Sequence, residues 1–246
     1  MKLLIEKESL KKFLVNENED FHTKWGKVSK EEINKTKAKS GMGKEFFSVS
    51  PSFHDLYRKI KRKAQIVSLT TLGRVAAESC LNKDSIVIDA GTGSGAACSY
   101  FSHLCKKIYT FDNNDSHIEV AKSNAKFLSL KNIKFTKSDV YEEGFKGVNG
   151  ESIDFVFLDL SEPHRMLEHS YNALKRGGIL AVCSPQMTQV SKLREKFDQI
   201  NSSEDKFTDF KVIEIIERSW KVEKDIARPS FDSLGHNGFI AFMRKI

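Results

Sequence analysis

The sequence predicts an α/β protein with a Rossmann-like, doubly wound and mostly parallel sheet of seven strands, preceded by a small β module. Two observations support this fold class. From about residue 66 onward, short apolar runs alternate with segments of helical periodicity, as in doubly wound sheets. Before residue 52 the apolar runs are short and typical of strands. We therefore expect a basic β module over 1–51, a connecting helix over 52–65 and a larger α/β domain over 66–246.

The larger domain contains seven runs that predict strands. They cover residues 85–91, 107–112, 133–139, 153–160, 177–185, 210–220 and 236–245. Helical segments are expected between most of them, ending near 103 and over 115–128, 166–174 and 187–199. Only a loop at 221–235 separates the last two strands. Those two strands can therefore pair as a hairpin, which would make one strand of the sheet antiparallel.

Positive charge is concentrated at the start of the chain. Residues 1–70 contain 16 Lys or Arg and 9 Asp or Glu, whereas residues 71–246 contain 24 of each. The helix predicted after Ser52 carries the apolar residues of FHDLYRKIKRKAQI on one face and four basic residues on the other, namely Arg58, Lys59, Arg62 and Lys63. This asymmetry favours a polyanion-binding appendage, with a solvated basic surface as the alternative.

Several protein classes do not fit the composition. No apolar run is long enough to span a bilayer, and the N-terminal segment MKLLIEKESLKKF lacks the apolar core of a signal peptide. The four cysteines form neither a CxxC pair nor a disulfide framework, and no metal site is expected. We therefore expect a cytoplasmic protein with reduced thiols and no contact with a membrane.

A glycine-rich loop follows the strand predicted at 85–91 and opens a helix. Glycines permit the tight turn there and allow the backbone to approach a ligand closely. The loop consists of Gly91, Thr92, Gly93, Ser94 and Gly95. A strand, a glycine loop and a helix in this order predict a nucleotide-containing cofactor at the carboxyl end of the sheet.

Carboxylates accompany this loop at successive strand ends. Asp89 precedes the first glycine by two residues, Asp112 ends the next strand, and Asp139 ends the third. In dinucleotide folds an acid at the place of Asp112 binds the ribose hydroxyls. A nicotinamide dinucleotide is one alternative, because Gly91 to Ala96 fits G-x-G-x-x-A, but Asp89 would face its pyrophosphate unfavourably. Three acids suit S-adenosylmethionine better, because it carries a sulfonium and an ammonium group.

Asp159 follows the apolar run FVFL at the end of the strand predicted over 153–160. Ligands of open α/β sheets bind at the carboxyl ends of the strands. A carboxylate in such a place is costly without a hydrogen-bond partner. We therefore expect Asp159 at the reaction centre, where it contacts the substrate or, alternatively, caps the backbone.

Several segments together resemble the tRNA (adenine-N1)-methyltransferases that act on the T-loop, in particular the archaeal and bacterial one-gene enzymes. The resemblance covers about residues 21–246 and rests on FHTKWGKV (21–28), EFFSVSPSFHDLYRKIKRKAQIV (45–67), DAGTGSG (89–95), LDLSEPHRMLEHSYNALKRGG (158–178) and ARPSF…GHNGFIAFMR (227–244). It implies a class I methyltransferase fold, S-adenosylmethionine as cofactor, tRNA as partner and a homotetramer. It further implies methylation at N1 of adenine 58, and in archaea also of adenine 57.

The resemblance assigns roles by position. Asp112 would bind the ribose of the cofactor, Asp139 its adenine and Ser94 its methionine part, while Asp159 would be the catalytic carboxylate. The full set expected at the cofactor is Gln65, Asp89, Gly91, Thr92, Gly93, Ser94, Gly95, Asp112, Asn113, Asp139 and Val140. Substrate contacts are expected from Arg58, Lys59, Arg62, Lys63, His164 and His236.

The sequence departs from the family pattern at three places. Val67 and Ser68 replace an aromatic residue and a proline, Cys183 replaces a tyrosine, and His164 replaces a tryptophan. Aromatic residues often stack on an extruded base, so the base clamp is expected to differ. Two alternatives follow: a methyltransferase for another RNA, a protein or a small molecule, and a non-catalytic RNA-binding subunit. The basic appendage argues against small-molecule and protein substrates, and the intact acids and glycines argue against the non-catalytic subunit.

Overall fold

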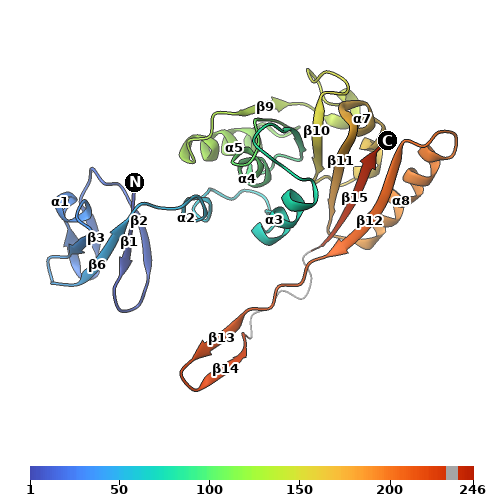
Figure 1. The fold of residues 1–246 in the computed structure, drawn as a ribbon. Helices are drawn as coiled ribbons and strands as arrows, with labels where there is room; N and C mark the ends of the chain where they lie inside the picture. The colour runs from blue at the N-terminus through green and yellow to red at the C-terminus, as the bar shows by residue number, and fades with distance from the viewer. Residues whose placement is uncertain (231–237) are drawn as a thin grey trace. The chain divides into compact units, whose positions relative to one another are not determined.

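The computed structural model describes residues 1–230 and 238–246, and the chain divides into two compact units (Figure 1). The first unit is Met1–Ile60 and the second is Lys61–Ile246. The division falls inside the segment 52–65 for which the sequence predicts a connecting helix.

The N-terminal unit is built on a four-stranded antiparallel sheet with the strand order β2-β1-β6-β5. Its elements are β1 (Lys2–Glu6), β2 (Lys12–Val15), β3 (Phe21–Thr23), β4 (Gly26–Val28), α1 (Lys30–Ile33), β5 (Lys37–Lys39), β6 (Glu45–Val49) and α2 (Phe53–Tyr57). A small apolar core centred on Leu4, Ile33 and Phe46 holds the unit together. The prediction of an N-terminal β module is thereby confirmed.

The helix predicted over 52–65 is much shorter in the structure, where α2 covers only Phe53–Tyr57. The backbone N–H groups of Lys61, Lys63 and Ala64 donate to the side chains of Asn124 and Ser94 instead of to helical carbonyls. A longer helix would also place like charges four residues apart, which is destabilising. These pairs would be Arg58 with Arg62 and Lys59 with Lys63.

The second unit contains a seven-stranded sheet with the order β12-β15-β11-β10-β7-β8-β9. Its strands are β7 (Ile86–Ala90), β8 (Lys107–Asp112), β9 (Ile133–Lys137), β10 (Ile153–Leu158), β11 (Leu174–Ser184), β12 (Phe207–Glu214) and β15 (Phe239–Lys245). β15 runs antiparallel to both of its neighbours, and the other adjacent pairs are parallel. The predicted mostly parallel sheet with one antiparallel strand is therefore confirmed.

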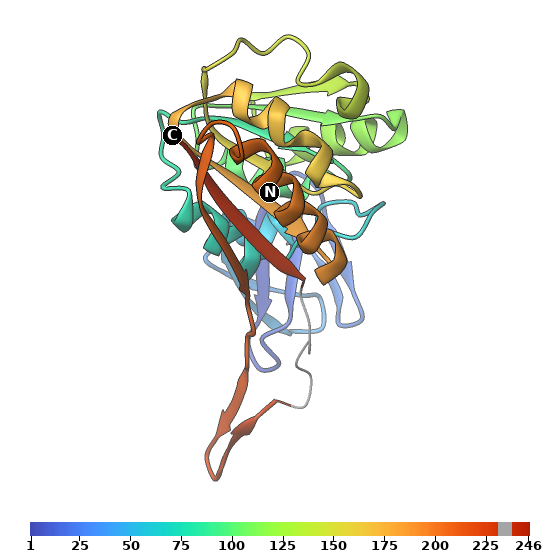
Figure 2. The ribbon, with the colours of Figure 1, turned by 90° about the vertical axis from the view of Figure 1, so that its right-hand side faces the viewer.

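Helices cover both faces of this sheet (Figures 1 and 2). One face carries α3 (Leu69–Glu78), α4 (Ala96–Ser102) and α5 (Asp115–Phe127), and the other carries α6 (Val140–Glu143), the 3-10 helix η1 (Pro163–Met166), α7 (Leu167–Ala173) and α8 (Met187–Asn201). On the first face Phe101 of α4 packs edge-on against Phe155 and Phe157 of β10. On the second face Leu193 and Phe197 of α8 belong to the main apolar core. Apolar side chains on both faces explain why the strands are continuous hydrophobic runs.

Two sequence predictions near the C-terminus were wrong in detail. The strand predicted over 210–220 is β12 and ends at Glu214, and the loop predicted at 221–235 contains a hairpin. This hairpin consists of β13 (Trp220–Glu223) and β14 (Ile226–Pro229), which pair only with each other. Figure 1 shows it extending beyond the seven-stranded sheet. Within the described part of the chain, no helix is both long and apolar enough to cross a membrane.

Candidate active site

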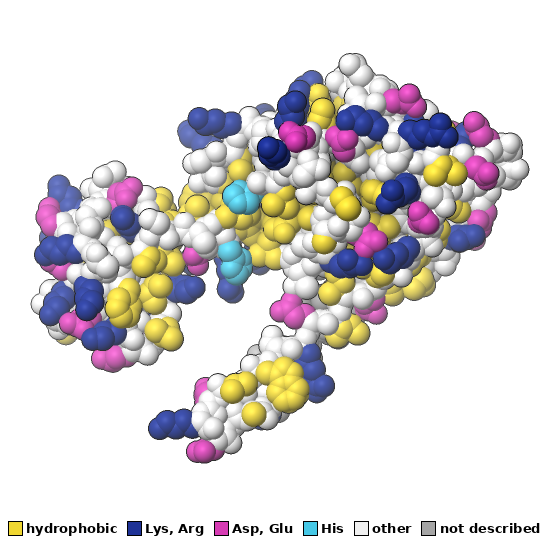
Figure 3. Space-filling model, viewed as in Figure 1, with side chains coloured by type: hydrophobic (Ala, Val, Ile, Leu, Met, Phe, Trp, Pro, Cys, Tyr) yellow, Lys and Arg dark blue, Asp and Glu magenta, His cyan; other side chains and the backbone are white. Residues whose placement is uncertain are grey.

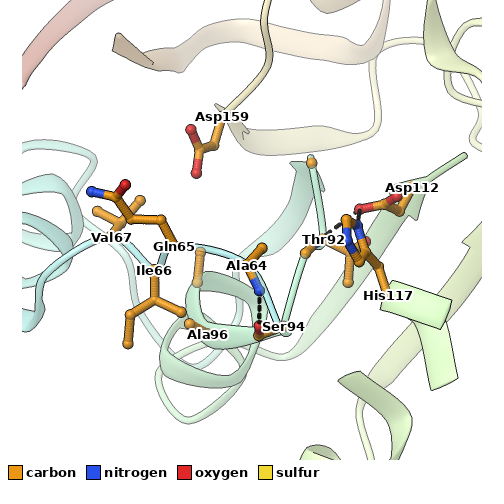
Figure 4. A pocket seen from close by; sticks show the side chains of 13 residues that line it. Ala64, Gln65, Ile66, Val67, Thr92, Ser94, Ala96, Asp112, His117 and Asp159 are labelled. Carbon is orange, nitrogen blue, oxygen red and sulfur yellow. Dashed lines mark hydrogen bonds and ion pairs between the residues drawn. The ribbon is translucent and has the colours of Figure 1, made fainter. Parts of the chain in front are cut away.

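A pocket lies at the carboxyl ends of β7, β8 and β10, next to the glycine loop (Figure 4). Among the described residues that line it there are two carboxylates and one imidazole, but no lysine or arginine. Such a lining attracts a cation rather than a pyrophosphate. The lining residues are Ala64, Gln65, Ile66, Val67, Gly91, Thr92, Gly93, Ser94, Ala96, Ala97, Asp112, His117 and Asp159.

The glycine loop joins β7 to α4 through a turn that requires glycine. The backbone N–H groups of Gly91 and Thr92 donate to the carbonyl of Phe111 at 3.0 and 3.1 Å, which ties the loop to β8. Gly91 and Gly95 have φ angles of +93° and +77°, which other residues rarely adopt. Gly95 also packs so closely on α5 that a Cβ atom would lie 2.7 Å from that of Ala121. The loop is therefore fixed before any ligand binds.

Asp112, the last residue of β8, supports the loop from one end of the pocket. One carboxylate oxygen accepts a hydrogen bond from the backbone N–H of Gly93 at 2.8 Å, and the other accepts one from that of Asn114 at 2.9 Å. The imidazole of His117 lies 3.3 Å from the first oxygen. Both Asp112 and His117 line the pocket (Figure 4). This acid is therefore oriented by the protein, as a group that binds ribose hydroxyls must be.

Asp89 lies beneath the loop and is fully buried. One of its oxygens accepts a hydrogen bond from the Thr110 hydroxyl at 2.6 Å, and the other has no hydrogen-bond partner among the described groups. Burial raises the pKa of Asp89 to about 7, and the charges of Asp159 and Asp112 add to this rise. A positive charge bound above the loop would favour the ionised form of Asp89.

Asp159 faces the pocket from the end of β10 (Figure 4). Its backbone N–H donates to the carbonyl of Ala90 at 2.9 Å, which continues the pairing with β7. Burial raises the pKa of its carboxyl to about 6. Cys183 lies on the neighbouring strand, one residue beyond the pair Leu158 and Val182. Burial and the Asp159 charge raise the pKa of the Cys183 thiol to about 12, so that the thiol stays neutral.

The segment Ala64–Val67 forms one wall of the pocket and carries Gln65. Ser94 holds this segment, because its hydroxyl accepts hydrogen bonds from the backbone N–H groups of Lys63 at 2.8 Å and Ala64 at 3.1 Å. The Ser94 hydroxyl, to which the resemblance assigns the methionine part of the cofactor, thus fastens the chain in the structure.

The remaining predicted cofactor residues do not line this pocket. Asp139 caps α6 by accepting a hydrogen bond from the N–H of Tyr141 at 3.0 Å, Val140 is buried behind it, and Asn113 is exposed. Gly95 begins α4 next to the pocket. The roles of these four residues at the cofactor stay predictions, as do those of the predicted residues that line the pocket.

The predicted substrate residues are spread over the chain. His164 lines a separate hollow with Arg165 and His169, and none of the described residues that line this hollow also lines the pocket that contains Asp159. His236 lies outside the described residues. Of the four basic residues, Arg58 and Lys59 belong to the first unit, and Arg62 and Lys63 to the second.

Sequence reasoning missed His117 and the apolar wall formed by Ile66 and Val67. His117 stands in the first turn of α5, five residues after Asp112. A helix that starts directly after a strand-ending acid brings its first turn back toward that acid, and this could have indicated the contact.

A seven-stranded sheet with one antiparallel strand, a glycine loop after β7 and an acid at the end of β8 define the class I methyltransferases that use S-adenosylmethionine. The structure of an S-adenosylmethionine-dependent O-methyltransferase from Thermotoga maritima is similar to this one, with a TM-score of 0.85 and 24% identity. The similarity covers 100% of this chain and 92% of that one. That likeness supports the fold.

The chain belongs to the family described as the tRNA methyltransferase complex GCD14 subunit, whose sequence profile matches residues 51–234. The predicted resemblance is thereby confirmed. The tRNA (adenine(57)-N(1)/adenine(58)-N(1))-methyltransferase TrmI of Methanocaldococcus jannaschii is 28% identical over 272 residues, covering 99% of this chain and 94% of the relative. The structure of the tRNA (m1A58) methyltransferase TrmI from Aquifex aeolicus has a TM-score of 0.80 and 26% identity, over 100% of this chain and 96% of that one.

Proposed function

We propose that this protein transfers a methyl group from S-adenosylmethionine to N1 of an adenine in the T-loop of tRNA, at position 58, with position 57 as a second candidate. One observation carries the proposal beyond family membership: the Asp159 carboxylate faces a pocket whose described lining contains no lysine or arginine. The activities for which the Methanocaldococcus and Aquifex relatives are named support the choice of adenine N1.

The polar and apolar residues at the pocket fit S-adenosylmethionine. Asp112 would accept hydrogen bonds from the ribose hydroxyls. Asp89 does not line the pocket and would contribute only its charge from beneath the loop. Gln65 and the apolar side chains of Ile66 and Val67 would cover the cofactor from the opposite wall. When bound, this cofactor supplies a methyl group on a sulfonium, which needs no metal. Within residues 1–230 and 238–246, no three His, Cys, Asp or Glu side chains are close enough together to hold a metal ion.

Asp159 would act on the target base through its charge. Adenine N1 has a lone pair in the plane of the ring, so it needs no general base, and alignment with the methyl group supplies much of the rate. Positive charge then grows on the adenine. The Asp159 carboxylate would accept a hydrogen bond from the exocyclic amino group and stabilise that charge. The neutral Cys183 thiol beside it adds no charge that would compete with this interaction.

Incubation of the protein with unmodified tRNA and isotope-labelled S-adenosylmethionine, followed by mapping of the methylated nucleoside, tests the proposal. We expect 1-methyladenosine in the T-loop, and the mapped position distinguishes adenine 57 from adenine 58. Cofactor binding without any methylation would favour the non-catalytic subunit, and label in a different base would contradict the assigned target. The expected cytoplasmic location belongs to the same proposal.

The N-terminal unit and the basic segment that follows it would bind the RNA backbone. We expect replacement of Arg58, Lys59, Arg62 and Lys63 by alanine to flatten the salt dependence of tRNA binding. Each lost phosphate contact should reduce the log–log slope by about 0.7–0.9, and cofactor affinity should not change. The measurement is the dissociation constant of tRNA over a series of salt concentrations.

Four exposed lysines provide a matched control for this experiment. They lie near the amino ends of β8 and β9, whereas the pocket lies at the carboxyl ends, and they are Lys106, Lys107, Lys131 and Lys134. Their replacement by alanine removes the same charge and should leave the slope unchanged. Equal slopes for the two quadruple variants would show that only total charge matters.

We further propose that the protein is a homo-oligomer, with the resemblance suggesting a tetramer. Support comes from the β13–β14 hairpin, on which Trp220 and Val222 are exposed on the same face. Figure 3 shows hydrophobic side chains on this hairpin. A two-stranded hairpin is marginally stable by itself, and clustered apolar side chains mark association surfaces. We expect sedimentation to show more than one chain per particle, and we expect a Trp220→Lys/Val222→Lys variant to be smaller. A wild-type protein that sediments as a single chain would contradict this part of the proposal.

A further inference from the structure

Asn124 of α5 fastens the chain segment that leads into the pocket wall. Its side-chain oxygen accepts a hydrogen bond from the backbone N–H of Lys61 at 2.8 Å. Its side-chain nitrogen donates to the carbonyl of Lys61 at 2.9 Å and to that of Ser94 at 2.8 Å. Asn124 is only 2% exposed, so that this amide joins α5, the glycine loop and the incoming segment with every bond made inside the protein.

The pocket wall is thereby held at both of its ends. On the amino side, Ser94 accepts hydrogen bonds from the N–H groups of Lys63 and Ala64, two and three residues after Lys61, which Asn124 holds. On the carboxyl side, Ser68 caps α3 through the N–H of Thr71 at 3.1 Å. The residues between these points, from Ala64 to Val67, line the pocket.

We propose that Asn124 is a positioning residue for S-adenosylmethionine. Asn124 does not line the pocket itself, and it acts by fixing the segment 61–64 on the glycine loop so that Gln65 lies over the cofactor. The inference rests on the proposed cofactor, and it concerns a residue that no local sequence motif points to. Without this clamp, cofactor binding would have to order the segment first, which weakens affinity.

Asn132 offers a matched control in the same unit. Its side-chain nitrogen also donates to two carbonyls, those of Ser102 and Cys105, each at 2.9 Å, and its oxygen accepts from the Ser102 hydroxyl. This second clamp lies at the amino end of β9, whereas the pocket lies at the carboxyl ends of the strands. Replacement of either asparagine by alanine leaves two carbonyls without their donor, so both variants should lose stability.

The experiment compares Asn124→Ala with Asn132→Ala in the full-length protein by calorimetric titration with S-adenosylmethionine, corrected for the folded fraction. We expect the dissociation constant to rise about tenfold for Asn124→Ala and to stay unchanged for Asn132→Ala, with similar losses in melting temperature. Equal affinities in the two variants would overturn the positioning role. Absence of binding by the wild-type protein would instead contradict the proposed cofactor.

A double-mutant cycle with Gln65→Ala tests the route of the effect. Gln65 is exposed, so its replacement should leave stability nearly unchanged. If Asn124 acts by placing Gln65, then Gln65→Ala should weaken cofactor binding in the wild-type background and have little effect beside Asn124→Ala. Fully additive effects would contradict this route. Should Asn124→Ala fail to fold, Asn124→Asp keeps the size of the side chain and an oxygen that can accept from the N–H of Lys61, but loses both N–H donations to the carbonyls of Lys61 and Ser94, and the same titration and cycle decide the question.

Discussion

Replacement of Asp159 by alanine is expected to lower the single-turnover rate of adenine methylation by about 10²–10³, the usual size for one electrostatic group. The affinity for S-adenosylmethionine should change little, because the carboxylate would serve the base. Asp159→Asn retains the shape and one acceptor oxygen but loses the charge. Its rate should fall between those of the wild type and Asp159→Ala if charge and hydrogen bonding both contribute.

The competing interpretation is that Asp159 caps the turn that follows β10. Among the described residues no hydrogen bond to its carboxylate is present, although its backbone N–H is bonded to Ala90. The raised pKa of Asp159 also means that ionising this carboxyl costs stability as the pH rises from about 4 to above 6. Both variants should therefore melt at or above the wild-type temperature at pH 8. A melting temperature low enough to explain the lost rate would favour the capping interpretation, and a full rate in folded Asp159→Ala would remove the catalytic role.

The same carboxyl predicts the acid side of the pH profile. The pKa of about 6 for Asp159 places protonation, and loss of its acceptor charge, just below neutral pH. Asp89, with a pKa raised to about 7, titrates in the same range and interacts with Asp159. The fall in kcat/KM on the acid side of the pH profile is therefore expected to reflect both groups. The value of kcat/KM should fall as the pH decreases through this range. The pH at which kcat/KM falls should shift in Asp159→Asn, because only Asp89 then remains to titrate.

The sequence predicted those parts of the site whose position depends on one strand and on the residues at its carboxyl end. Asp112 and Asp159 each follow an apolar run, and a run of five or six residues suffices to place its last side chain at the carboxyl edge of the sheet. The glycine loop is similarly local, since its turn depends on its own residues. By contrast, the bonds of Asn124 reach residues 30 and 63 positions away in the sequence, and no periodic pattern reports such contacts.

Two further features near these elements do not follow from a local pattern. The resemblance places His164 among the substrate contacts, because it replaces the tryptophan of a family motif. In the structure the chain turns into η1 and His164 lines another hollow, so its role at the substrate stays a prediction. The hairpin was missed because the run 210–220 was interpreted as one strand. Apolar and charged residues alternate in Trp220–Glu223, which is typical of a separate strand. In the structure β12 ends at Glu214, six residues before this second strand begins.

The backbone of Asp159 requires a glycine at position 91. In Gly91→Ala the new Cβ atom would lie 2.0 Å from the carbonyl oxygen of Asp159, and no side-chain rotation can relieve contact with a backbone atom. We expect a loss of stability above about 4 kcal/mol, the range of severe core disruptions, measured by urea unfolding at neutral pH. Any folded fraction should bind S-adenosylmethionine weakly, because the clash displaces the glycine loop, Asp159 or both.

Gly177→Ala is a control that shows how much stability is lost through the left-handed backbone conformation alone, without a steric clash. Gly177 has a φ angle of +82°, close to the +93° of Gly91, but its added Cβ atom would meet no other atom within 4 Å. That variant should lose only the 1–2 kcal/mol or so of a left-handed conformation, with unchanged cofactor affinity. Equal losses in the two variants would mean that the loop can move away from β10 at little cost. In that case the close contact between Gly91 and Asp159 would not be what fixes the position of the loop relative to the carboxylate. Binding of the cofactor would have to fix it instead.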